Sequence, residues 1–69
     1  MEFLFVASVV VSGTEFELYY SSKEASYKVR QFEVRSGDLL ITDDDLSDAL
    51  WLVESDEEAV RTVAEFATA

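Results

Sequence analysis

The sequence predicts an α+β fold, in which a small antiparallel β-meander of three to four strands packs with one or two C-terminal helices. Two observations lead to this prediction. Short runs of β-branched and aromatic residues, separated by turns, fill the first half of the chain and are typical of strands. Apolar residues in the second half recur at helical spacing behind acidic residues that suit helix N-termini. With 69 residues and no cysteine, we expect one domain, with a sheet half at 1–41 and an acidic helical half at 42–69.

The most apolar segment is the run FLFVASVVV at residues 3–11. Both of its faces are largely apolar, so it does not alternate as a half-exposed strand would. We expect a strand that is covered on both sides, or covered on one side by this chain and on the other by a partner. Glu2 and the short length of the run argue against an export signal or a membrane span, and the lack of cysteine suits a cytoplasmic location.

A second and a third strand are expected to follow. Gly13 lies between two apolar runs and predicts a hairpin turn, because glycine adopts positive φ without steric cost. Residues 15–20 alternate clearly between apolar and polar, which indicates a half-buried strand. A polar loop at 21–26 separates this strand from a third at 27–35.

The third strand changes phase, because its apolar residues move from odd to even positions after Val29. One extra residue restores the register, so the pattern predicts a β-bulge near Arg30 and Gln31. Basic side chains on its exposed side are expected to pair across the sheet with acidic ones. The basic residues are Lys28, Arg30 and Arg35, and the acidic ones are Glu15 and Glu17.

Residues 39–41 are apolar and predict a brief fourth strand after a turn at 36–38. Thr42 precedes three aspartates, which favours a helix over 43–53 with Thr42 as its cap. The run at 49–53 is apolar all round, so a buried strand remains the alternative for this segment.

The last segment contains a capping box, with Ser55 as the N-cap and Glu58 three residues later. It predicts a helix to the end of the chain whose apolar side carries Ala59 and Val63. The absence of proline leaves open a single continuous helix with a polar seam near Ser55.

The net charge of −10 is unevenly distributed. Residues 1–36 hold five acidic and four basic residues, whereas residues 37–69 hold ten acidic residues against Arg61 alone. Such a surface repels nucleic acid and membrane headgroups, and attracts a basic surface on another protein. The ten acidic residues are Asp38, Asp43, Asp44, Asp45, Asp48, Glu54, Asp56, Glu57, Glu58 and Glu65.

Neither catalysis nor a cofactor is expected. The chain has no His and no Cys, and helix capping accounts for its clustered carboxylates. Four oxygen-bearing residues match positions 1, 3, 5 and 12 of a calcium-binding loop, but Asp48 stands where that loop needs glycine, so we expect no specific metal site. The four are Asp43, Asp45, Ser47 and Glu54.

In size and composition the whole chain resembles small phage-encoded inhibitors of host or defence enzymes, namely anti-restriction proteins, anti-CRISPR proteins and DNA mimics. No motif carries this resemblance, so it assigns no residue a role. It implies a non-enzymatic inhibitor whose carboxylates imitate the phosphates of a nucleic acid and block a basic nucleic-acid-binding surface.

The expected contact residues lie in the acidic half, with one tryptophan as an aromatic anchor or, alternatively, as a core residue. They are Asp43, Asp44, Asp45, Asp48, Trp51, Glu54, Asp56, Glu57 and Glu58. The alternative function is a small structural or assembly subunit, which uses residues 3–11 to form a homodimer or to bind a larger partner. In that case the acidic residues serve only solubility.

Overall fold

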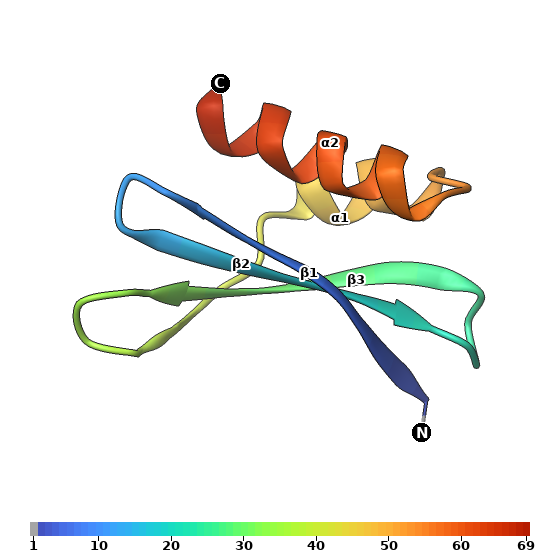
Figure 1. Cartoon of the computed structure of the whole chain (residues 1–69), viewed down its shortest axis with the longest axis horizontal. Coiled ribbons are helices and arrows are strands. Elements are labelled where there is room, and N and C mark those ends of the chain that lie inside the picture. The colour runs from blue at the N-terminus through green and yellow to red at the C-terminus, as the bar shows by residue number, and fades with distance from the viewer. Residues whose placement is uncertain (1) are drawn as a thin grey trace.

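A computed structural model describes residues 2–69 as a four-stranded antiparallel sheet followed by two helices (Figure 1). The α+β prediction is therefore confirmed. The strands are β1 (Phe3–Val11), β2 (Thr14–Ser21), β3 (Ser26–Glu33) and β4 (Leu39–Leu40), and the helices are α1 (Asp44–Trp51) and α2 (Asp56–Thr68). Strand order in the sheet follows chain order, β1-β2-β3-β4, so the sheet is a meander.

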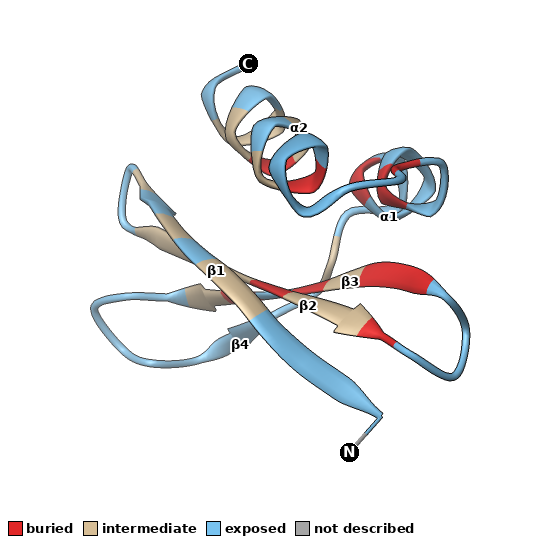
Figure 2. Ribbon diagram, turned by 45° about the vertical axis from the view of Figure 1, so that its right-hand side comes forward, coloured by how far each residue is buried: buried red, intermediate tan, exposed pale blue. Residues whose placement is uncertain are grey.

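The two helices form a second layer on one face of the sheet (Figures 1 and 2). Helix α1 packs over β3, and α2 packs over β1 and β2. The core between the layers consists of Phe16, Leu18, Tyr27, Val29, Leu46, Leu50, Val53, Ala59 and Val63. We call the opposite face, which no described segment covers, the outer sheet face.

Strand β1 is an edge strand, and its one strand partner within residues 2–69 is β2. The expectation that this chain covers it on both sides is wrong, because both helices lie on the same side of the sheet. Its exposed large side chains are Phe3, Leu4, Phe5 and Val10. The two helices cover one face of the sheet, and the other described residues form the strands and their connections. No described segment is therefore left to cover the second side of β1.

The predicted β-bulge in β3 is also wrong. The register between β2 and β3 is continuous from Ser26 to Glu33, and the irregularity lies in β1, between Phe5 and Ala7. The residue inserted there, Val6, packs against the core. Neighbouring side chains of a regular strand point to opposite faces, so either Val6 or Ala7 would point away from the core. The bulge lets both lie on the core side.

The phase change in β3 has a different cause, because both faces of this strand carry large side chains. Val29 and Gln31 are buried beneath the helices, while Phe32 lies on the outer sheet face. There the guanidinium carbon of Arg30 lies 5.2 Å from the centre of the Phe32 ring. The cation covers the aromatic ring, so an apolar side chain is tolerated on the uncovered face.

Residues 43–53 contain a helix, so the strand alternative is wrong, and α1 is shorter than predicted at its C-terminal end. Its N-cap is Asp43, not Thr42: the Asp43 carboxylate accepts a hydrogen bond from the backbone N–H of Asp45 at 2.8 Å. The hydroxyl of Thr42 instead donates to the carbonyl oxygen of Val29 at 3.3 Å and ties the start of α1 to β3.

The capping box of α2 is confirmed at Ser55, whose side chain accepts a hydrogen bond from the backbone N–H of Glu58 at 3.2 Å. Ser55 is extended, with φ −144° and ψ 156°, so α1 and α2 do not fuse into one helix. Strand β4 is shorter than the predicted 39–41, since Ile41 lies outside it and is 95% exposed.

Two leucines near the end of α1 test the packing between the layers. Leu50 is fully buried, whereas Leu52 is 78% exposed. We expect Leu50→Ala to lower the free energy of unfolding by about 2–5 kcal/mol, because it leaves a cavity in the core. The same change at Leu52 is expected to stay within about 0.5 kcal/mol. Urea denaturation measures both, and equal losses at the two positions would contradict the packing described.

Candidate functional site

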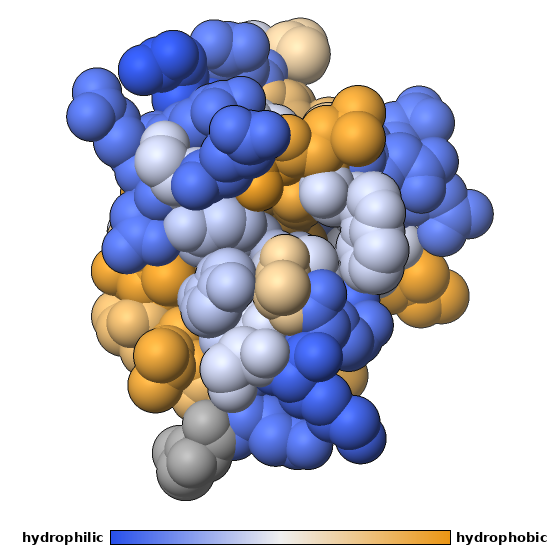
Figure 3. Space-filling view, turned by 90° about the vertical axis from the view of Figure 1, so that its right-hand side faces the viewer, coloured by the Kyte–Doolittle hydropathy of each residue, from blue (hydrophilic) through white to orange (hydrophobic). Residues whose placement is uncertain are grey.

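The helical half of the chain carries most of the negative charge, and the fold places it in one layer. Residues 42–69 hold nine acidic residues against Arg61, a net charge of −8, whereas the described sheet half at 2–41 holds six against four basic residues. We call 42–69 the acidic helical layer. Its nine acidic residues are all exposed: Asp43, Asp44, Asp45, Asp48, Glu54, Asp56, Glu57, Glu58 and Glu65. Figure 3 shows hydrophilic surface at the upper left and the right around an apolar patch, a further hydrophilic area at the lower right, and apolar surface at the lower left.

Apart from Trp51, the predicted contact residues divide into two clusters, one on α1 and one around the start of α2. The α1 cluster is Asp43, Asp44, Asp45 and Asp48, and the α2 cluster is Glu54, Asp56, Glu57 and Glu58. The carboxylates in the first turn of each helix stabilise it, because they face the positive end of the helix dipole. They are Asp44 and Asp45 in α1, and Asp56, Glu57 and Glu58 in α2. The α1 cluster lies on the first helix and the α2 cluster around the start of the second, so the fold brings both into one layer.

Few of these carboxylates have a basic partner. Within residues 2–69 the acidic helical layer contains one ion pair, between Arg61 and Glu57 at 3.5 Å, and that pair is exposed. No ion pair reaches the α1 cluster from the described residues. The charge of the α1 cluster is therefore uncompensated within this part of the chain and available to an external cation.

The basic residues of β3 pair within the sheet half instead. Arg30 contacts Glu17 at 3.2 Å, as predicted, and the hydrogen bond to Glu17 together with the nearby Tyr19 raises the pKa of Arg30. Lys28 pairs with Glu24 at 3.2 Å, not with either of the two predicted acidic residues.

Trp51 is 58% exposed, so the core alternative for this residue is wrong. Leu46 and Leu50 form the buried side of α1, and Trp51 lies on the flank of the helix that faces β3. The ammonium of Lys28 lies 5.4 Å from the centre of the indole ring. Trp51 is available to a partner, and its role as an anchor stays a prediction.

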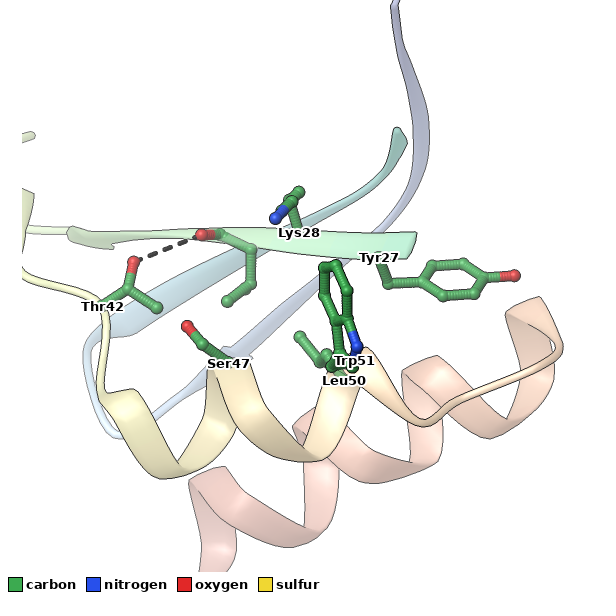
Figure 4. A pocket seen from close by; sticks show the side chains of 7 residues that line it. Tyr27, Lys28, Thr42, Ser47, Leu50 and Trp51 are labelled. Carbon is green, nitrogen blue, oxygen red and sulfur yellow. Dashed lines mark hydrogen bonds between the residues drawn. The ribbon is translucent and has the colours of Figure 1, made fainter. Parts of the chain in front are cut away.

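A pocket of about 120 Å³ lies between α1 and β3 (Figure 4). In Figure 4, Ser47, Leu50 and Trp51 extend from α1 towards the strand, and Thr42 closes one end through its hydrogen bond to Val29. The lining residues are Tyr27, Lys28, Val29, Thr42, Ser47, Leu50 and Trp51. Sequence reasoning missed this pocket, because it depends on how α1 is placed against β3.

Asp56 has a partner inside the protein. The buried phenol of Tyr27 donates a hydrogen bond to its carboxylate, 29 residues away in the chain, and joins the start of β3 to the first turn of α2. Burial raises the pKa of Tyr27 to about 12, and the hydrogen bond to Asp56 adds to this effect. No local pattern in the sequence indicates this contact.

The outer sheet face holds a second hollow, which the sequence did not indicate. It has a volume of about 470 Å³ and is lined by Phe3, Tyr19, Lys28 and Arg30. The rings of Phe5 and Tyr19 meet edge to face beside it, with their centres 5.7 Å apart. Aromatic surface on this face is therefore accessible next to the paired basic residues.

The described residues show neither a metal-binding cluster nor a membrane span. Within 2–69, no three His, Cys, Asp or Glu side chains converge as a metal site would require. None of the helices in this part of the chain is long and apolar enough to cross a membrane.

Comparison with protein-family models, curated proteins and solved structures gives no match for this chain.

The Tyr27–Asp56 hydrogen bond predicts a pH dependence of stability. Because the pKa of Tyr27 is raised in the folded state, its stabilising effect is complete below the unfolded-state pKa of about 10 and is lost as the pH rises through about 12. We expect Tyr27→Phe to have a lower free energy of unfolding than the parent at neutral pH. The difference between the two proteins is expected to decrease as the pH rises from about 10 to about 12. Urea denaturation across this range measures it, with Tyr19→Phe on the outer sheet face as the control. A difference that stays constant would contradict the assignment.

Proposed function

We propose that this protein is a non-enzymatic inhibitor that binds another protein through its acidic helical layer. The proposed target is the basic, nucleic-acid-binding surface of a host or defence enzyme in the cytoplasm. One observation supports the proposal above the others: nine exposed carboxylates occupy one layer of the fold, and within residues 2–69 almost all of them lack a basic partner.

The physical basis is charge complementarity. Carboxylates about 5–7 Å apart approximate the spacing of phosphates along a nucleic-acid strand. The α1 cluster and the α2 cluster place eight such charges along the acidic helical layer. A partner that binds phosphates already has the matching cations in place, and long-range attraction speeds the encounter.

Trp51 adds an apolar contact between the two clusters. It lies at the end of α1, after the α1 cluster and before the α2 cluster. Exposed tryptophan is enriched among the residues that dominate binding energy at protein interfaces. The carboxylates on both sides of this indole would attract a basic partner, and burial of the indole against the partner would stabilise the complex.

Neutralising part of the α1 cluster tests the proposal. We expect the triple change Asp43→Asn, Asp44→Asn and Asp45→Asn to weaken capture of the partner from a lysate at least about tenfold at low salt, because it removes three charges that the partner would neutralise. Asparagine also serves as an N-cap, so α1 is expected to persist. Capture of the parent protein is expected to decrease as salt increases.

A matched variant separates a local effect from a change in net charge. Glu15→Gln, Glu24→Gln and Glu33→Gln remove the same number of charges from the sheet half and are expected to leave capture nearly unchanged. Equal losses for the two triple variants would show that overall charge alone matters. Capture that is indifferent to the change in the α1 cluster would refute the proposal.

Strand β1 supports a second candidate function, a small assembly subunit. It is a nine-residue edge strand without a charged residue, and its large side chains near the N-terminus are exposed. Long, uncharged and apolar edges favour pairing with another strand, because their backbone N–H and C=O groups lack partners. We propose a homodimer, or a complex with a larger partner, as the state in which this edge is used.

A charge placed on β1 tests the assembly function. Val10 is exposed in β1, and Val10→Lys is expected to shift an oligomer to monomer in size-exclusion chromatography with light scattering, because an ammonium on the edge opposes strand pairing. Ile41→Lys, which adds the same charge at an exposed position outside the sheet, is the control. A parent protein that is monomeric at all concentrations would exclude the homodimer, and a complex with a larger partner that is equally stable with Val10→Lys would exclude the other form of this function.

A further inference from the structure

Strand β3 has an unpaired edge next to α1. One edge of β3 pairs with β2 along its whole length. On the opposite edge β4 pairs with Gln31 and Phe32 alone, so within residues 2–69 this edge has no strand partner before Gln31. This free segment borders the pocket between α1 and β3.

The direction of the free backbone groups follows from the bonds around them. The N–H of Glu33 donates to the carbonyl of Asp38, and the carbonyl of Val29 accepts from the Thr42 hydroxyl, so both groups point away from β2. Backbone groups in a strand alternate with a period of two residues. The N–H of Val29 and both backbone groups of Tyr27 therefore point to the same edge, and β4 does not reach them.

The pocket beside this edge has an apolar base, and Lys28 is the one charged residue among the described residues that line it, while aspartates lie along the neighbouring flank of α1. Val29 and Leu50 are buried at its base. On α1, Asp44, Asp48 and Trp51 follow one another at helical spacing along one flank, with Ser47 between them lining the pocket. The two aspartates are exposed and have no ion pair within the described chain.

We propose that the groove between the free edge of β3 and α1 binds an extended basic peptide segment of a partner protein, which adds as a strand to β3. The free backbone groups of Tyr27 and Val29 suit a strand as their partner, because an extended backbone presents N–H and C=O groups at matching intervals. An apolar side chain enters the pocket over Val29 and Leu50.

The side chains two residues before and after that apolar residue lie on the same face of the added strand. Lysine or arginine at these positions reaches towards Asp44 and Asp48. The Lys28 ammonium near the indole of Trp51 shows that this ring already attracts a cation. The segment therefore alternates, with basic, apolar and basic side chains facing α1. This inference deepens the proposed function and depends on it for the negative charge of the layer.

The test uses a five-residue peptide of lysine, threonine, valine, threonine and lysine, blocked at both ends. Trp51 is the only tryptophan in the chain, so its fluorescence reports binding at the groove. We expect a saturable change in this fluorescence, together with shifts of the Tyr27 and Val29 amide signals in nuclear magnetic resonance spectra. No response up to millimolar peptide would overturn the proposal, while partner capture by the acidic helical layer is tested separately.

Two methylated peptides distinguish strand addition from attraction by charge. Methylation of the valine backbone nitrogen removes a donor that points to β3, whereas methylation of a threonine nitrogen alters a group that points to solvent. We expect the first peptide to bind at least about tenfold more weakly than the second, since it loses a hydrogen bond and gains a steric clash. Equal affinities would overturn strand addition and leave the charge-based function intact.

Two protein variants test which flank of α1 faces the peptide. Asp48→Asn is expected to weaken binding of the unmethylated peptide more than Asp45→Asn, although both remove one charge from the same helix. The reverse order, or no difference, would contradict the placement of the peptide in this groove.

Discussion

The structure depends on the packing of two helices against one face of a four-stranded sheet. The side chains of Leu18, Leu46, Leu50 and Val63 are fully buried between these layers. The chain has no cysteine, so no disulfide contributes to stability, and a domain of 69 residues has room for one core. Because both helices lie on the same side, their exposed surface is also where the acidic residues of the second half collect.

The same acidic residues serve two purposes. Asp43 caps α1, and the carboxylates after Ser55 lie in the first turn of α2, where they interact favourably with the helix dipole. Helix formation thus accounts for where the two clusters begin, and the turn between the helices keeps both in one layer. The outer sheet face contrasts with this layer, since its basic residues are paired and its aromatic side chains are accessible.

Local patterns in the sequence predicted the elements well, and contacts between distant segments explain what was missed. The hairpins and the Ser55 cap depend on neighbouring residues, so they could be predicted. The sequence pattern predicts a bulge in β3 because Phe32 is out of phase with Val29, yet the Phe32 ring lies on the uncovered face beneath Arg30. The exposure of Trp51 depends on where α1 meets β3, which no local pattern contains.

The central claim is that negative charge is concentrated on the helical side of the molecule. The most direct measurement is the relaxation of backbone amide protons by a cationic paramagnetic co-solute, compared with a neutral one of the same size. We predict that the cationic co-solute is enriched near the exposed amides of α1 and α2 and much less near those of β1, with the contrast decreasing as salt is added. Equal enrichment on both sides of the sheet would contradict the account.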